Sequence, residues 1–352
     1  MHKQSHFTDN LSMKRALYSL CAVFCAIGMQ AQDAQLLNLK AEVRVDYQRE
    51  HLDGSTYEPN TGFKGKYVNI LMNGEITPQF SYSYRQRLNK AHKDQSFFDA
   101  TDWAYITYKP DAHWSLSGGK QVVGIGGFEY DRAPINLYFC SEFWNNIPCY
   151  QLGASVTYSI GQGNDQLMAQ VCQSPWRLSE ADMYAYNLMW MGNHGRYSSL
   201  WSANLLEYLP GKYIFYLALG NQLQLGASTR LQVDLMNRAV SHHPMLLKDC
   251  SVMAELSHRC RKVNMFCKMT YDVNATGQEG DFCVTDGTEM KSVGAGIEFF
   301  PAKGTDDVRL HANAVYAWGK NGNVDGTMLP KQTRVDVGVT WRMNLLSFTN
   351  KK

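Results

Sequence analysis

The sequence predicts an all-β fold, a transmembrane antiparallel β-barrel of about sixteen strands with long extracellular loops and short periplasmic turns. Three observations lead to this prediction. Apolar and polar residues alternate with a period of two along most of the chain. Beyond the N-terminal segment, no apolar run approaches the ~20 residues that a spanning helix needs. Short and long connections also alternate, and in lipid only helices and closed barrels satisfy all backbone polar groups.

The N-terminal segment, residues 1–31, predicts a secretory signal peptide. Lys14 and Arg15 precede an apolar stretch, and small residues follow near Ala31, where we expect cleavage. The apolar stretch is too short to span a bilayer comfortably as an anchor. Met13 is a candidate true start, because the basic pair follows it directly.

The mature chain, residues 32–352, begins with the clearest strand. One face carries the apolar residues Leu37, Leu39, Ala41, Val43, Val45 and Tyr47, and polar residues lie between them. The C-terminal segment repeats the pattern with Val335, Val337, Val339, Trp341 and Met343. Further strands are expected over 63–74, 79–88, 102–110, 113–123, 150–160, 164–174, 182–193, 196–208, 212–224, 227–239, 248–259, 261–273, 289–300 and 306–318. This pattern is that of strands with one lipid-facing and one lumen-facing side.

The connections between these strands support a barrel. Short turns follow the even-numbered strands, as at 161–163, 193–195 and 301–305. Longer connections tend to follow the odd-numbered strands, as at 49–62, 89–101, 124–149, 274–288 and 319–331. This asymmetry is typical of outer-membrane barrels. A soluble β-sandwich also alternates, but it does not need so many strands of membrane-crossing length.

Composition and motifs exclude several functions. The formal net charge of +2 gives no indication of nucleic-acid binding. We find no nucleophile elbow, phosphate loop or zinc-protease motif, so we expect a protein that is not an enzyme. The cysteines after residue 31 are odd in number and form no Cys-x-x-Cys pair, so we expect neither a metal site nor a cofactor.

Three sequence stretches resemble the phosphate-selective porin O and P family, in the form found in Bacteroidetes-type bacteria. They are FDATDWAY at 98–105, GKQ at 119–121 and GGFEYD at 126–131. The resemblance implies a sixteen-stranded porin in the outer membrane of a Gram-negative bacterium, commonly a homotrimer surrounded by outer-membrane lipid. It would pass small hydrophilic solutes or anions, with its third long loop folded into the pore. The sequence departs from the family in one respect. Such barrels usually end on an aromatic residue that serves as the assembly signal, whereas here a tail follows Trp341, so we expect this signal at Trp341 or Phe348.

The longest connection, residues 124–149, is the candidate constriction loop. It carries Glu129, Asp131 and Arg132, and Lys120 closes the strand before it. Charged residues at a constriction set the size and charge of what passes. An ordinary exposed loop is the alternative, because most long loops lie on the surface.

The alternation also predicts which charges face the lumen. The basic candidates are Lys40, Arg44, Arg85, Arg87, Arg230 and Arg309. Lys40 and Arg44 alternate with acidic residues on their own strand, which favours local pairing. Arg85 and Arg87 have no acidic neighbour on theirs and are the better candidates for an anion path. The alternative is that all of these residues are ordinary charges of a polar lumen and set no preference for anions.

Cys140 and Cys149 form a candidate disulfide in the second half of the constriction loop, since export leads to an oxidising compartment. The leading function is a water-filled channel for passive diffusion of small hydrophilic solutes, with a preference for anions such as phosphate. The alternatives are a receptor barrel that binds a partner through its extracellular loops and a barrel enzyme acting on lipids.

Overall fold

The computed structural model describes residues 35–90, 97–177, 182–240, 247–322 and 331–349. The predicted signal peptide and its candidate start Met13 lie outside these residues. Within the described residues, no helix combines the length and the apolar character that a membrane-spanning helix requires.

The strands form one sheet. Its first half comprises β1 (Gln35–Leu52), β2 (Ser55–Thr56), β3 (Gly62–Thr77), β4 (Phe80–Arg87), β5 (Thr101–Tyr108), β6 (Trp114–Val122), β7 (Tyr150–Ile160), β8 (Asp165–Gln173) and β9 (Tyr184–His194). Its second half comprises β10 (Tyr197–Leu209), β11 (Lys212–Gln224), β12 (Thr229–Val240), β13 (Asp249–Cys260), β14 (Val263–Asn274), β15 (Glu289–Phe299), β16 (Val308–Lys320) and β17 (Lys331–Thr349). The sheet has 17 strands, and without the two-residue β2 it has 16 long ones.

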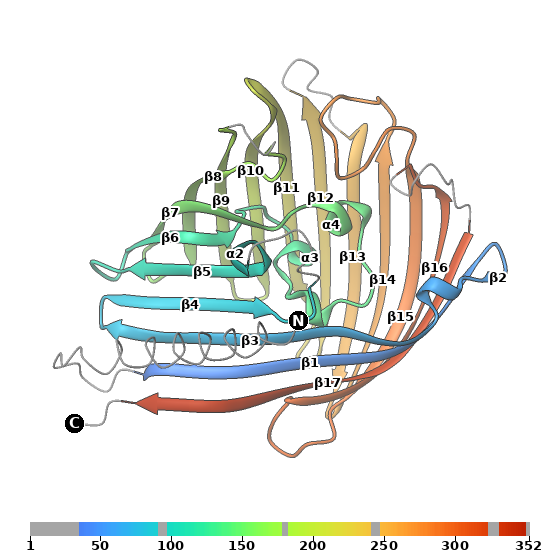
Figure 1. The fold of residues 1–352 in the computed structure, drawn as a ribbon, viewed down its shortest axis with the longest axis horizontal. Helices are drawn as coiled ribbons and strands as arrows, with labels where there is room; N and C mark the ends of the chain where they lie inside the picture. The colour runs from blue at the N-terminus through green and yellow to red at the C-terminus, as the bar shows by residue number, and fades with distance from the viewer. Residues whose placement is uncertain (1–34, 91–96, 178–181, 241–246, 323–330, 350–352) are drawn as a thin grey trace, which may run out of the picture.

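The sheet closes on itself as an antiparallel barrel (Figure 1). Each long strand pairs with its neighbours along the chain, and β1 pairs with β17 from Gln35 opposite Thr349 to Leu52 opposite Gln332. Closure removes the unpaired edges that an open sheet would expose. The predicted barrel is therefore confirmed, and the predicted strands lie within a few residues of the observed ones.

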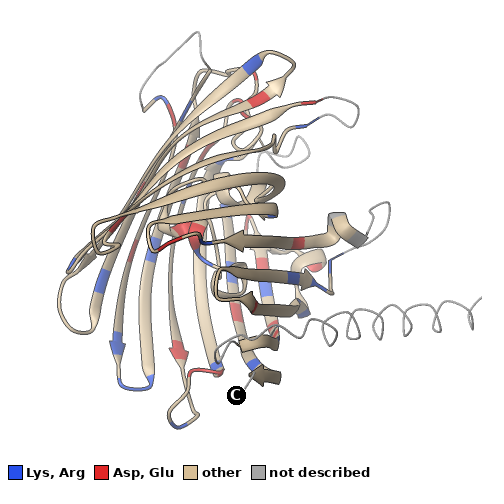
Figure 2. Cartoon of the chain, turned by 90° about the vertical axis from the view of Figure 1, so that its left-hand side faces the viewer, with Lys and Arg blue, Asp and Glu red and all other residues tan. Residues whose placement is uncertain are grey.

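Alternation places the two faces as predicted, and β14 shows it clearly. The side chain of Met269 points outward and is 55% exposed, whereas its neighbours Lys268 and Thr270 are buried inside the barrel. Figure 2 shows long stretches of strand without charged residues on the side that faces the viewer. A bilayer accepts such an outer face, because charged side chains are costly at its centre.

Short helices occur in the connections. They are η1 (Glu58–Asn60), α2 (Phe97–Ala100), α3 (Phe128–Asp131), η2 (Pro134–Asn136) and α4 (Glu142–Asn146). Three of them, α3, η2 and α4, belong to residues 123–149, which we call the inner loop. The inner loop lies within the ring of strands (Figure 1). The connection predicted as the constriction loop therefore folds into the barrel.

Candidate pore constriction

Glycines allow the inner loop to enter close to the wall. The backbone N–H of Gly126 donates to Ser202 Oγ at 2.8 Å, and that of Gly127 donates to Leu200 O at 3.0 Å. A Cβ on Gly126 would lie 2.5 Å from Leu200 O, and Gly127 has a positive φ of 104°. Only glycine fits both requirements without strain. The Gly-Gly pair therefore turns the chain from β6 into the lumen.

A buried ion pair holds α3 against the opposite wall. Glu129 lies 2.6 Å from the Nζ of Lys268 on β14, and both side chains are buried. The Glu129 carboxylate also accepts from the backbone N–H of Ser141, further along the loop, at 3.1 Å. The Glu129 backbone N–H donates to Asp234 on β12 at 2.7 Å. Charge-assisted contacts of this kind fix the path of the loop.

The start of α4 is capped from two sides. Ser141 is its N-cap, and the Ser141 hydroxyl accepts from the Trp144 N–H at 3.2 Å. The carboxylate of Asp272 on β14 accepts from the N–H groups of Glu142 at 3.0 Å and Phe143 at 3.3 Å. These contacts satisfy backbone donors that a helix leaves without partners inside the barrel.

Four basic side chains from four wall strands donate to backbone carbonyls of the loop tip. The contacts, in chain order of the carbonyl, are Arg309 of β16 to Ile135 O, Arg44 of β1 to Leu137 O, Arg334 of β17 to Tyr138 O and Lys268 of β14 to Phe139 O. Carbonyl groups within the lumen need such donors, because a buried carbonyl without a partner is costly. These cations therefore position the loop.

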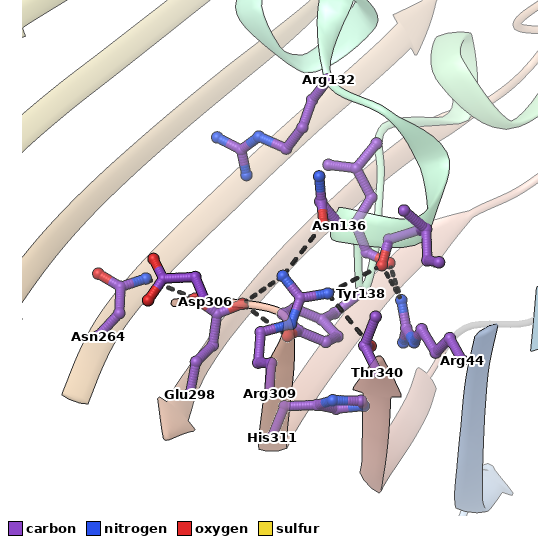
Figure 3. Close-up of polar contacts among 12 residues, drawn as sticks. Arg44, Arg132, Asn136, Tyr138, Asn264, Glu298, Asp306, Arg309, His311 and Thr340 are labelled. Carbon is purple, nitrogen blue, oxygen red and sulfur yellow. Dashed lines mark hydrogen bonds and ion pairs between the residues drawn. The ribbon is translucent and has the colours of Figure 1, made fainter. Parts of the chain in front are cut away.

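Tyr138 is the central side chain of the loop tip. Its ring stacks on Phe266 with centroids 5.4 Å apart and lies 4.8 Å from the ring of His311. The Arg44 guanidinium lies 4.6 Å from the same ring. The Tyr138 hydroxyl donates to Glu298 at 2.7 Å (Figure 3). Aromatic, cationic and acidic groups therefore hold Tyr138 in one place.

Two chambers lie on opposite sides of the segment 137–139, which borders both. The extracellular chamber, of about 460 Å³, is bordered by residues in the extracellular halves of β3 and β14–β17 together with Arg44 of β1. The periplasmic chamber, of about 290 Å³, is bordered mainly by the periplasmic halves of β12–β16. The loop tip is thus the divider between an outer and an inner part of the lumen.

The extracellular chamber has no excess of positive charge. Its basic residues are Arg44, Lys66, Lys291 and Arg334, and its acidic residues are Glu142 and Asp272. Ion pairs join Arg44 to Asp46 at 2.6 Å, Lys291 to Glu289 at 2.7 Å and Arg334 to Asp336 at 3.1 Å. With these partners counted, carboxylates are at least as numerous as cations in this chamber.

The periplasmic chamber is bordered by four basic and two acidic residues, and it keeps one cation more than carboxylates when the ion-pair partner Glu129 is also counted. Its basic residues are Arg132, Arg230, Lys268 and Arg309, and its acidic residues are Glu255 and Glu298. Ion pairs join Arg132 to Glu255 at 2.8 Å and Arg309 to Glu298 at 3.1 Å (Figure 3), and Lys268 pairs with Glu129 behind the chamber wall. Among the residues that the structure describes, Arg230 forms no ion pair and its Nε has no hydrogen-bond partner. Arg230 is therefore the unbalanced charge of this chamber.

The predicted constriction residues have different positions. Arg132 borders the periplasmic chamber. Glu129 is buried and holds the loop. Asp131 is exposed but borders neither chamber. Lys120 is buried at the end of β6, where its Nζ donates to Phe98 O at 3.0 Å, and it also borders neither chamber.

Arg85 and Arg87, the preferred anion-path residues, have no acidic neighbour on their own strand β4, but both pair with an acidic residue of the next strand. Arg85 lies 2.9 Å and Arg87 lies 3.3 Å from Asp102 on the neighbouring strand β5. Arg85 is buried, and its guanidinium lies 4.0 Å from the ring of Trp103. A comparison of residues along β4 alone could not reveal this partner, because Asp102 belongs to β5.

The other predicted cations divide between the two chambers. Arg44 borders the extracellular chamber, and Arg230 and Arg309 border the periplasmic one. Lys40 is half-buried and borders neither. Within the wall, Arg44 pairs with Asp46, as the alternation of charges on β1 suggested.

The candidate disulfide between Cys140 and Cys149 is not formed in the structure, where both residues are free thiols. Both lie in the inner loop, outside the spanning strands. Burial raises the pKa of Cys149 to about 11 and that of Cys140 to about 12. Both side chains are therefore protonated thiols near neutral pH, and the thiolate needed for disulfide exchange is scarce.

Sequence reasoning missed Lys268 and Tyr138. Lys268 was identifiable, because its neighbour Cys267 faces outward and a period of two then turns Lys268 inward. Tyr138 carries no comparable signal, since its contacts on β1, β14, β15 and β16 depend on the tertiary path of the loop.

Comparisons with known proteins agree with this geometry. An anion-selective porin from Comamonas acidovorans superposes with a TM-score of 0.59 at 10% identity, covering 87% of this chain and 99% of that one. The outer-membrane channel DcaP of Acinetobacter baumannii gives 0.62 at 12% identity, covering 87% and 97%. In-vitro folded OmpT of Vibrio cholerae, in its trimer form, gives 0.56 at 12% identity, covering 88% and 100%.

At such identities these structures are evidence for the shared barrel fold alone. No curated protein matches the sequence. The profile of the phosphate-selective porin O and P family matches residues 37–230, which are 194 of the 352 residues. The protein is an outer-membrane porin, a channel of the Gram-negative outer membrane and not an enzyme, and it belongs to the phosphate-selective porin O and P family.

Proposed function

We propose that this porin prefers small hydrophilic anions, phosphate among them, and that the periplasmic chamber is where the preference arises. The observation that carries the proposal is the cation excess of this chamber, in which Arg230 has no carboxylate partner. The extracellular chamber is balanced and supplies no such preference. Family membership supports the same direction, as does the anion selectivity in the name of the Comamonas acidovorans porin.

The positions of the carboxylates strengthen the proposal. Glu255 accepts from both guanidinium NH groups of Arg132 at 2.8 Å. Glu298 accepts from Tyr138 and from Asn264, each at 2.7 Å (Figure 3). Acceptors that are engaged in this way repel a passing anion less than free carboxylates would, because neighbouring donors already screen their charge. An excess of donors then faces the solute.

We further propose that residues 1–31 are removed as a signal peptide and that three copies assemble in the membrane. The trimer form of OmpT supports the second point. Phosphate as the favoured solute rests on the family alone.

The test is the reversal potential of the refolded barrel in a planar bilayer under a KCl gradient. We expect a potential on the chloride side for the native chain and a clear shift toward zero for Arg230→Gln. Arg87→Gln is the matched control, since it makes the same change on a cation that borders neither chamber, and it should leave the potential unchanged. A native channel without ion preference would overturn the proposal. An equal shift in both variants would show that the preference does not arise in the periplasmic chamber.

A further inference from the structure

A second loop also enters the barrel. Residues 275–288, which we call the second inner loop, connect β14 to β15 but make contacts as far away as β10 and β12. Gln278 Oε1 accepts from the Val240 N–H at 2.8 Å, and its amide donates to Arg238 O at 3.1 Å. A Cβ on Gly280, whose φ is 90°, would lie 2.6 Å from the ring of Tyr208 on β10. The loop therefore extends from β14 and β15 across the lumen face of the wall as far as β10.

A buried ion pair fixes this crossing. Arg238 of β12 and Asp281 of the second inner loop lie 2.7 Å apart, and both side chains are fully buried. Arg238 also donates to Ser251 Oγ and to Val273 O, each at 2.8 Å. Asp281 additionally accepts from the Val284 N–H at 3.1 Å. Donors and acceptors of the pair are thus engaged on all sides, which is the condition under which a buried pair defines one arrangement.

The two inner loops share an apolar core inside the barrel. The inner loop contributes Val123, Ile125, Tyr130, Phe143 and Ile147; the second inner loop contributes Cys283 and Val284; and the wall from β8 to β12 contributes Cys172, Ala185, Leu206, Tyr208, Ile214, Tyr216, Ala218 and Met236. Asn146 of α4 joins the loops directly, since its amide donates to Cys283 O at 2.9 Å. The lumen face of a porin wall is ordinarily polar and lined by water. Here the wall residues are apolar and buried under the two loops, so the loops fill this side of the lumen.

Neither chamber is bordered by described residues of β8–β11, which supply most of the wall side of this core. Among the described residues, their wall positions come from β1, β3 and β12–β17, and none comes from β4–β11. We propose that the second inner loop is a second constriction element, which seals the β8–β12 side together with the inner loop and confines solutes to the opposite side of the lumen. Arg238 and Asp281 are the positioning residues of this seal. The inference rests on the channel function and is independent of anion preference.

The experiment combines pore size with the accessibility of Cys283, a natural reporter inside the core. Proteoliposome swelling with neutral sugars of increasing size measures the pore without reference to charge. A small membrane-impermeant thiosulfonate reports on Cys283, with labelling located by mass spectrometry. The variants are Asp281→Asn, which breaks the buried pair, and its matched control Glu279→Gln. Glu279→Gln also replaces a carboxylate of this loop by an amide, but Glu279 forms an exposed ion pair with Lys212.

For the native chain and Glu279→Gln we expect no labelling of Cys283 and the same sugar cut-off. For Asp281→Asn we expect labelling of Cys283, faster swelling, admission of larger sugars and larger single-channel conductance. Labelling of Cys283 with an unchanged cut-off would overturn the proposal, because a displaced loop would then leave the pore as it was. Equal labelling of Cys283 in the native chain would also overturn it.

A second variant covers the case in which Asp281→Asn does not fold. Deletion of 276–286 together with Arg238→Gln removes the loop and the cation that it would leave without a partner. A heat-modifiable barrel of this variant should pass larger sugars than the native chain. A folded deletion variant with the native cut-off would overturn the second constriction, whereas a changed reversal potential alone would bear only on the anion proposal.

Discussion

The Tyr138 hydroxyl donates to Glu298 at 2.7 Å and thereby joins the tip of the inner loop to the wall of the periplasmic chamber. The same carboxylate accepts from Asn264 at 2.7 Å and pairs with Arg309 at 3.1 Å. Glu298 is thus a shared acceptor for the loop and for two wall strands. The loop tip between the chambers is consequently held by Glu298 of the periplasmic chamber in addition to the basic side chains that bind its carbonyls.

Replacement of the ring at the divider should widen the pore. We expect Tyr138→Ala to increase single-channel conductance, because the ring that separates the chambers is removed. Tyr138→Phe is its control: it keeps the ring and loses one hydrogen bond to a carboxylate, worth about 1.5–3 kcal/mol. Planar-bilayer recordings of both variants check this. Native conductance in a folded Tyr138→Ala barrel would show that the divider does not limit flow.

The buried pair between Glu129 and Lys268 should contribute strongly to stability. Glu129→Gln leaves Lys268 as a buried cation without its carboxylate, which costs about 3–5 kcal/mol. Unfolding followed by heat modifiability and by denaturant titration measures the loss. Glu279→Gln, at an exposed pair, should leave the unfolding midpoint unchanged. Similar midpoints for the two variants would mean that the inner loop does not depend on the buried pair.

Arg85 and Arg87 share one carboxylate, yet their replacement should have unequal effects. Arg85→Gln removes a fully buried guanidinium that pairs with Asp102 and lies over Trp103. The Arg87 side chain is 23% exposed and makes the longer contact with Asp102. We therefore expect the greater fall in unfolding midpoint for Arg85→Gln and an unchanged reversal potential for both. A shifted potential would restore the anion path along β4 that the sequence suggested.

The two cysteines of the inner loop should be free, reduced thiols in the isolated protein. We expect complete alkylation of Cys140 and Cys149 after unfolding without reductant, and the same conductance with and without dithiothreitol. Peptide mass spectrometry gives the alkylated fraction of each residue. A peptide pair linked through Cys140 and Cys149 would contradict the structure and support the disulfide that the sequence suggested.

The strands were predictable because a lipid-facing surface imposes a period of two on every one of them. The range expected over 212–224 coincides with β11, and that over 150–160 coincides with β7. The two-residue β2 was not predicted, because its pairing with β1 has no alternation to reveal it. The last strand extends to Thr349, beyond the expected end near Met343, so both Trp341 and Phe348 lie within β17.

The pore was only partly predictable, because its contacts join residues far apart in the sequence. The length and glycines of 124–149 indicated an inward loop, and alternation indicated Arg309 as a lumen residue. Neither signal reveals that Arg309 donates to Ile135 O, 174 positions away. The apolar core inside the barrel was also hidden, since Leu206 and Ile214 give β10 and β11 apolar residues on both faces.

The seam of the barrel has a consequence for its assembly. Arg44 and Arg334, which hold successive carbonyls of the inner loop, belong to β1 and β17, the two strands whose pairing closes the ring. These strands are the most distant in the chain, so theirs is the pairing of longest sequence separation in the barrel. A barrel that is still open lacks half of the four cations at the loop tip. Closure of the ring and completion of the restraint on the loop tip are therefore one step, because the β1–β17 pair supplies both the last seam of the wall and these two cations.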